Sequence, residues 1–146
     1  MSGMLTAPYQ DFARTKLGFE FSDINLLITA LTHRSYVNEH KKSVSEHNER
    51  LEFLGDAVLE LIVTDFLFHN YAEPEGTLTS WRAALVRTES IGEAGDKLGY
   101  EPLIRMSRGE KQGSKRARQQ ILANAFEAVI GAIYLEKGYD AAEVFI

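Results

Sequence analysis

The 146-residue chain contains no cysteine, which excludes disulfide bonds and thiolate metal ligands. No apolar run is long enough to cross a membrane, and the N-terminus lacks the charged-then-apolar pattern of a signal peptide. We therefore expect a cytoplasmic protein with no membrane partner. Basic residues are outnumbered by acidic ones, and the net charge of -5 argues against binding nucleic acid through bulk charge. A local basic patch is still compatible with that balance.

Sustained alternation of polar and apolar residues, the pattern of a half-buried strand, is also missing. Helical spacing recurs instead, and at 45% apolar residues the chain is long enough for one domain with a core. The sequence thus predicts an all-α protein. Ser22 and Thr77 are expected to cap helices, and Gly18, Gly99 and Gly138 to end them. The predicted helices cover residues 9–17, 24–30, 47–68, 78–86, 88–98, 116–135 and 139–146.

The longest of these segments, His47–Phe68, is apolar on almost every side, which is typical of a buried helix. Glu49, Glu52 and Asp56 are spaced so that they stack on one face near its start. Carboxylates grouped beside apolar positions repel each other and resist desolvation. A bound divalent cation would relieve both problems, and oxygen ligands of this kind suit Mg²⁺ or Mn²⁺.

A second strongly apolar helix, predicted over 116–135, carries Asn124 and Glu127 three residues apart. If the two apolar helices lie side by side, Glu52 and Asp56 from one and Asn124 and Glu127 from the other can converge on one metal ion. The sequence therefore indicates a candidate metal site between the two helices.

Simpler explanations of these acids remain open. Acids near helix N-termini interact favourably with the helix dipole, and these could also form ion pairs with Arg50, Arg82 or Arg87. A similar choice applies upstream, where His33 and Arg34 are either functional or polar side chains that cap a helix end.

The segment Leu103–Gln120 is rich in basic residues and contains a single acid, Glu110. Most such segments are solvated loops, and composition alone favours that interpretation. The alternative is a segment that contacts phosphate groups. Its basic residues are Arg105, Arg108, Lys111, Lys115, Arg116 and Arg118.

Several segments together resemble the catalytic domain of the ribonuclease III family, bacterial type, from about Tyr9 onward. A twelve-residue signature followed by a second matching helix is far more specific than a short motif. The matching segments are ALTHRSY (30–36), NERLEFLGDAVL (48–59), PEG (74–76), SRGE (107–110) and ILANAFEAVIGAIYLEKGY (121–139).

The resemblance implies a single, homodimeric, helical endonuclease domain over residues 9–146, preceded by a flexible terminus over 1–8. The double-stranded-RNA-binding domain that usually follows in bacterial relatives is absent from this chain. The implied activity is hydrolysis of double-stranded RNA with Mg²⁺, for which Mn²⁺ can substitute, giving 5′-phosphate and 3′-hydroxyl ends during RNA processing. The basic segment would contact the RNA backbone.

Matched position by position, Glu52, Asp56 and Glu127 fall on the family's metal-binding acids, and Asp56 and Glu127 on its catalytic ones. Glu49 and Glu75 fall on two auxiliary acids of the same centre. These roles are what the resemblance implies.

Two further positions bear on the function. Phe53 matches an aromatic side chain that the family inserts into the partner subunit, although an ordinary core residue would fit the same spacing. Asn124 stands where the family most often has aspartate, and it offers a metal an oxygen without the charge, so reduced activity is expected. The alternatives are a non-catalytic dimeric RNA-binding or ribosome-associated member of the fold, or a helical scaffold that binds no Mg²⁺.

Overall fold

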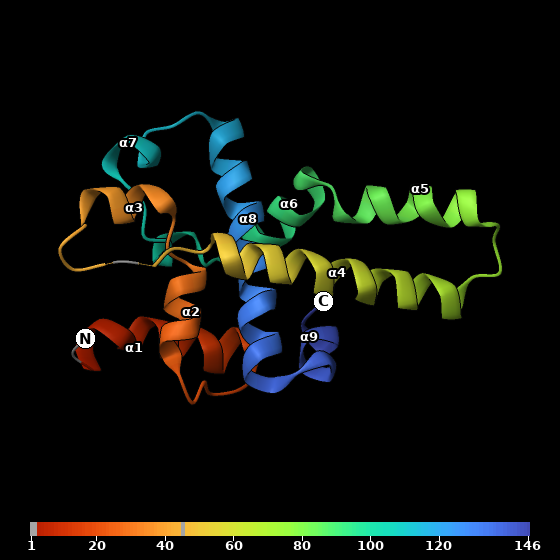
Figure 1. Ribbon diagram of the computed structural model, residues 1–146, viewed down its shortest axis with the longest axis horizontal. Coiled ribbons are helices and arrows are strands. Elements are labelled where there is room, and N and C mark those ends of the chain that lie inside the picture. Colours follow the sequence, from red (N-terminus) through yellow and green to blue (C-terminus); the bar gives the residue numbers. More distant parts are fainter. Residues whose placement is uncertain (1–2, 45) are drawn as a thin grey trace.

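The computed structural model describes residues 3–44 and 46–146, and this part of the chain is a set of helices joined by short turns (Figure 1). The extended pairing within it is an isolated parallel bridge between Thr32 and Arg105. The all-α prediction is confirmed. The elements are α1 Gly3–Phe12, η1 Ala13–Leu17, α2 Ile24–Ala30, α3 Arg34–Glu39, α4 Glu49–Asn70, α5 Glu75–Val86, α6 Thr88–Leu98, η2 Glu101–Leu103, α7 Arg108–Lys111, α8 Lys115–Lys137 and α9 Tyr139–Phe145.

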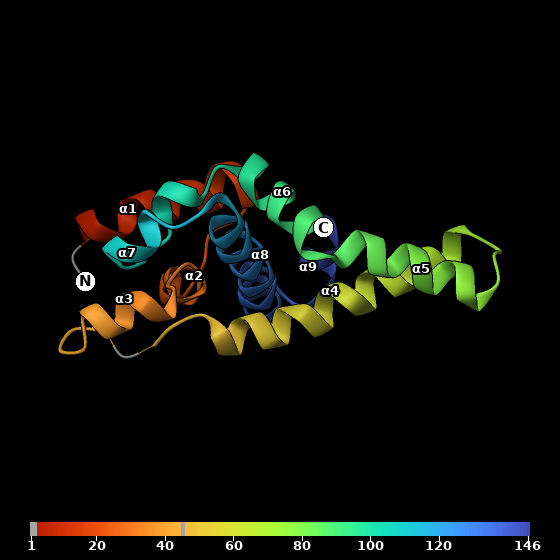
Figure 2. The ribbon, with the colours of Figure 1, turned by 90° about the horizontal axis from the view of Figure 1, so that it is seen from above.

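The centre of the molecule is α8, which α2, α4, α6 and α9 contact. Figure 2 shows α8 nearly end-on, with α4 on one side and α6 on the other. Its middle is fully buried, as at Val129, Ile130 and Ile133, which have no exposed surface. Burial all round explains why its sequence is apolar on every face.

Glycines let the other helices approach α8 closely. A Cβ atom added at Gly55 of α4 would overlap the backbone carbonyl oxygen of Glu127, and one added at Gly131 would overlap that of Leu51. At Gly92 of α6, a Cβ would lie 2.8 Å from Gln119 Cγ. The glycines of α6 therefore reflect close helix packing.

The prediction that α4 is buried on nearly every side is wrong. One face, with Val58, Leu59 and Ile62, is buried against the body, but Phe53 and Phe68 are 83% and 72% exposed. The reason is visible in Figure 1, where α4 and α5 form a hairpin that extends away from the other helices. Only one side of the hairpin meets the core within this chain.

Two predicted caps differ in the structure. Asp23, not Ser22, caps α2 by accepting a hydrogen bond from the Asn25 backbone N–H, whereas Ser22 donates its hydroxyl to Glu136 at 2.8 Å. The α5 helix begins at Glu75 after Pro74, so Thr77 lies inside it. The helix ends at Gly18, Gly99 and Gly138 are confirmed, since all three have positive φ.

The N-terminal prediction is tested only in part. Residues 3–8, expected to belong to a flexible terminus, are helical in α1. Met1 and Ser2 of that terminus, and also Ser45, lie outside the described residues. Within the described part, no helix is long and apolar enough to span a membrane.

Candidate active site

The crossing of α4 and α8 brings together acids that are far apart in sequence. Since Leu51 and Gly55 touch the α8 backbone at Glu127 and Gly131, the intervening turn of α4 lies directly on α8. Glu52 belongs to that turn and Asp56 follows it. The predicted convergence of α4 and α8 acids is therefore present in the structure.

Asp56 and Glu127 are close enough for their carboxyl groups to share a hydrogen bond. Burial, that hydrogen bond and the charges of Asp56 and Glu52 raise the pKa of Glu127 to about 8. Burial, together with the charges of Glu49 and Asp56, also raises the pKa of Glu52. A proton shared between two carboxyl groups is the usual response of an acid cluster that lacks a cation.

The ion-pair explanation of these acids fails at the crossing, whereas Glu49 and Glu52 do lie in the first turn of α4, where the helix dipole favours acids. Glu52 and Glu127 are half-buried, not fully solvated. No described basic side chain forms an ion pair with Glu52, Asp56 or Glu127, and the pair that Arg82 makes is with Glu60. The negative charge of the cluster is therefore reduced by the proton that Asp56 and Glu127 share and not by a basic side chain of the described residues.

The donor chemistry fits a hard divalent cation, because carboxylate oxygens converge with no competing cation. Among residues 3–44 and 46–146, however, no three acidic or histidine side chains are already arranged closely enough to hold a metal ion. The Asp56–Glu127 hydrogen bond explains this, since the two carboxyls point at each other. Binding an ion would require loss of that proton and rotation of the side chains.

The other predicted ligand, Asn124, and the auxiliary acid Glu49 form hydrogen bonds or ion pairs with residues outside the Glu52, Asp56 and Glu127 cluster. Asn124 is half-buried one turn before Glu127, and its side-chain oxygen accepts a hydrogen bond from Gln120 Nε2 at 2.9 Å. Glu49 lies one turn before Glu52 and is tied to Arg34, with 3.6 Å between Arg34 Nε and Glu49 Oε1.

Glu75 is not part of the cluster within one chain. It begins α5, beyond the far end of α4 (Figure 1). With a rise of about 1.5 Å per residue, the fourteen helical steps from Asp56 to Asn70 alone span about 20 Å. Glu75 cannot share an ion with Asp56 of its own chain.

The basic segment divides into two groups. Arg105, predicted to contact RNA, is half-buried and turned inward: its Nε donates to Thr32 Oγ1 at 2.9 Å, and its guanidinium lies over the Tyr36 ring. These contacts favour a structural role for Arg105 over contact with RNA. Arg118 forms an ion pair with Glu101 at 3.2 Å. The remaining side chains are exposed and form no ion pair within the described part of the chain: Arg108, Lys111, Lys115 and Arg116.

The sequence prediction missed two residues that matter to the site, Gly55 and Gly131, and left the role of a third, His33, undecided. Gly55 and Gly131 set the helix crossing, and the available signal was a glycine inside each of two apolar helices, where glycine is destabilising without a packing reason. His33, which was either functional or a cap, does cap α3, accepting from the Ser35 backbone N–H at 3.1 Å.

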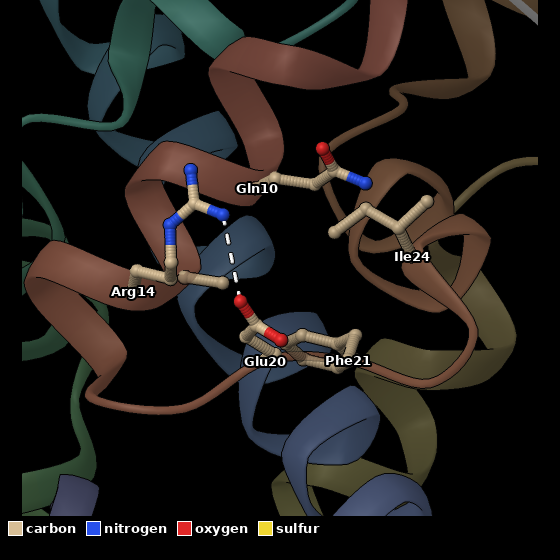
Figure 3. A pocket seen from close by; sticks show the side chains of 6 residues that line it. Gln10, Arg14, Glu20, Phe21 and Ile24 are labelled. Atoms are coloured by element: carbon tan, nitrogen blue, oxygen red, sulfur yellow. Dashed lines mark hydrogen bonds and ion pairs between the residues drawn. The ribbon is translucent and has the colours of Figure 1, made fainter. Parts of the chain in front are cut away.

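Two cavities in the described part of the chain lie away from the acids. One, of about 120 Å³, lies between η1 and the start of α2, where Arg14 reaches Glu20 at 3.5 Å and Gln10, Phe21 and Ile24 form the rest of the wall (Figure 3). Another, of about 550 Å³, lies between α6 and the start of α8. Neither of these two cavities is lined by Glu52, Asp56 or Glu127.

Comparison with known proteins adds the family. The family model described as ribonuclease-III-like matches residues 23–146. The chain belongs to the ribonuclease-III-like family. It is 51% identical over 133 residues to Ribonuclease 3 of Clostridium acetobutylicum and 46% identical over 131 residues to that of Listeria monocytogenes. These matches cover 90% and 89% of this chain and 57% of each relative, so the chain spans little more than half of their length.

Solved ribonuclease-III-like structures show the same fold. The nuclease domain of ribonuclease III from Campylobacter jejuni, described with a flexible region involved in dimer formation, is 44% identical with a TM-score of 0.82, over 92% of this chain and 91% of that one. Dicer from Pichia stipitis is 29% identical with a TM-score of 0.61, over 87% of this chain and 53% of that one. The resemblance stated from the sequence motifs is confirmed.

Proposed function

We propose that this chain is the endonuclease domain of a ribonuclease III, which hydrolyses phosphodiester bonds of double-stranded RNA with a divalent cation. The observation that carries the proposal is the carboxyl pair of Asp56 and Glu127, joined by Glu52 and uncompensated by any described basic side chain. Membership of the ribonuclease-III-like family supports it. The products would carry 5′-phosphate and 3′-hydroxyl ends.

Glu52, Asp56 and Glu127 would hold Mg²⁺ or Mn²⁺, with Asn124 as a neutral fourth ligand once its amide leaves Gln120. The ion, when bound, activates water and neutralises charge that develops on the phosphate. Glu127 must first lose its proton, since its pKa of about 8 keeps it protonated at neutral pH in the absence of a cation. Glu49, held by Arg34, would orient water at the edge of the cluster.

The RNA backbone would be contacted by the exposed part of the basic segment: Arg108, Lys111, Lys115 and Arg116. Duplex RNA is recognised mainly through its shape, its phosphates and its 2′-hydroxyl groups. A few lysines and arginines on one surface meet that need despite the acidic net charge of the chain.

The working form would be a homodimer, built on the apolar surface of the α4–α5 hairpin. Exposed apolar side chains gather there: Phe53, Leu61, Phe66, Phe68, Tyr71, Trp81 and Leu85. A surface of this kind on a single chain marks a protein interface. Phe53, at 83% exposure, is no core residue of its own chain, which favours its role as an aromatic anchor in a partner subunit. Sedimentation of Phe53→Ala should show a shift from dimer to monomer, and an unchanged dimer would remove Phe53 from the interface.

The direct test is cleavage of labelled duplex RNA in the presence of Mg²⁺. Asp56→Ala and Glu127→Ala should each abolish cleavage, because each removes a ligand of the ion. Glu93→Ala, which removes an exposed acid on α6, is the matched control and should cut at the wild-type rate. Wild-type cleavage by both site variants would refute the proposed roles.

Asn124 favours a second candidate, a non-catalytic dimeric RNA-binding or ribosome-associated protein, because it removes one charge from the site. The same assay separates the two. If the wild-type chain binds duplex RNA without cutting it at any Mg²⁺ concentration, and Asn124→Asp cuts it, the second candidate is correct.

A further inference from the structure

The carbonyl groups of Ala30, which ends α2, and of the next two residues, Leu31 and Thr32, form a docking row for two distant segments. Ala30 O accepts a hydrogen bond from Asn48 Nδ2 at 3.1 Å, and Thr32 O accepts from the Asn48 backbone N–H at 2.9 Å. Leu31 O, between them, accepts from the Arg105 backbone N–H at 2.7 Å. Carbonyls at a helix C-terminus have no partner within the helix. Here Asn48 and Arg105 provide donors for the Ala30 carbonyl at the end of α2 and for the two carbonyls that follow it.

Asn48 is unusual for its position. It directly precedes α4, where asparagine commonly caps the helix by accepting from a backbone N–H of the first turn. Its side chain forms no such bond, although it is only 3% exposed. The buried amide donates across to α2 and not into its own helix. The hydrogen bond of the Asn48 side chain therefore links α4 to α2. A bond to the first turn of α4 would have stabilised α4 alone.

The contact between Asn48 and α2 lies close to the acid cluster in the chain. The Asn48 carbonyl oxygen accepts the hydrogen bond of the Glu52 backbone N–H at 2.8 Å, so Glu52 lies one helical turn from the docking point. On the other side, α2 packs against α8, and its Leu27 and Leu31 have no exposed surface. Through α2, the start of α4 is braced against the helix that carries Glu127.

The docking row is itself held firmly. Thr32 is fully buried, and its hydroxyl donates to Ile28 O at 2.6 Å and accepts from Arg105 Nε at 2.9 Å. The Arg105 guanidinium lies 4.7 Å from the centre of the Tyr36 ring. Because the docking row is held in place, the acceptor of the Asn48 side-chain amide has a fixed position.

We propose that Asn48 is a positioning residue that fixes the first two turns of α4 on α2 and thereby sets Glu52 and Asp56 against Glu127. It touches neither phosphate nor cation. Its consequence for cation binding depends on the proposed function, whereas its effect on α4 does not.

Amide hydrogen exchange of the metal-free protein tests the effect on α4. In Asn48→Ala, amides of residues 52–58 should exchange about five- to tenfold faster, the factor that loss of one buried hydrogen bond gives. Tyr9→Phe is the control, because it removes another part-buried bond, from the Tyr9 hydroxyl to Leu103 O at 2.8 Å, in which neither α4 nor Asn48 takes part. Equal exchange of residues 52–58 in both variants would overturn the inference.

Calorimetric titration of Mn²⁺ tests the consequence for the acids. Asn48→Ala should bind Mn²⁺ about tenfold more weakly than wild type, by loss of preorganisation of the ligands, and Tyr9→Phe should bind within about twofold of it. Asn48→Ser serves if the alanine variant fails to fold, because serine caps α4 well but cannot reach Ala30 O. Wild-type affinity in Asn48→Ser would contradict the proposed positioning. If wild type itself neither binds Mn²⁺ nor cuts RNA, the proposed function fails, and hydrogen exchange alone decides the role of Asn48.

Discussion

Replacing Gly55 by alanine should break the helix crossing on which the acid cluster depends. The added Cβ would overlap the Glu127 carbonyl oxygen and lie 2.6 Å from its carbonyl carbon and 3.0 Å from the Gly131 nitrogen. Since a normal carbon–carbon contact is about 3.5–4.0 Å, α4 and α8 must separate by roughly 1 Å or more. The obstacle is backbone on both sides, so no side-chain rotation relieves it.

The magnitude follows from two opposing effects. Overpacking a close-packed core costs about 3 kcal/mol at the upper end of the usual range, and alanine returns about 1 kcal/mol through its higher helix propensity. We therefore expect Gly55→Ala to lower the free energy of unfolding by about 2 kcal/mol or more. Urea denaturation followed by circular dichroism measures this change.

Gly76→Ala is the matched control, because Gly76 lies in the first turn of α5 and a Cβ there meets no atom within 4 Å. It should be neutral or up to about 1 kcal/mol more stable. Cleavage of duplex RNA by Gly55→Ala should fall even where the variant remains folded, since the acids move apart. A Gly55→Ala protein with wild-type stability and wild-type cleavage would refute the account of the crossing.

Three other predictions concern charge. The pKa of Glu127 is raised from 4.5 to about 8, so the folded metal-free protein holds the extra proton and its stability should fall as pH rises through that window. Glu127→Gln should remove on the order of 1–2 kcal/mol of this fall, allowing for partial solvent screening. Urea midpoints at pH 5 and pH 8.5 that shift equally in both proteins would contradict this prediction. Asn124→Asp should tighten Mn²⁺ binding by about tenfold, because it adds an anionic ligand, and calorimetry showing no gain would place residue 124 outside the site. Arg116→Ala should reduce the slope of the logarithm of the RNA-binding constant against the logarithm of salt concentration by about 1. Arg105→Ala should instead lower the free energy of unfolding by about 1–3 kcal/mol and leave that slope unchanged. A reduced slope in Arg105→Ala with an unchanged slope in Arg116→Ala would make Arg105 the phosphate contact.

Much of the fold was predictable because its signals are local. Gly18, Gly99 and Gly138 end helices through their own backbone conformation, and the apolar sequence of α8 reflects burial on all sides. The exposed face of α4 was not predictable in this way. Apolar periodicity does not distinguish a face that meets the body of its own chain from one that awaits a partner, as Phe53 shows.

The candidate site was predictable where residue type and helical spacing were enough, as for Asp56 and Glu127. It was not predictable where a role depends on a distant contact. Arg105 belongs to a run of basic residues, but its bond to Thr32, 73 residues away, turns it inward. Asn48 has the sequence position of a helix cap, and only the docking of α4 on the end of α2 shows that its amide acts elsewhere.

The most direct test of the cation site is a calorimetric titration of the metal-free protein with Mn²⁺ at pH 7, in two buffers of different ionisation enthalpy. A pKa raised to about 8 means that Glu127 carries a proton on most molecules at this pH, so binding should release close to one proton per ion. Glu127→Gln should lose both the tight binding and the proton release. Saturable binding without proton release, or equal binding by Glu127→Gln, would contradict a cation held between α4 and α8.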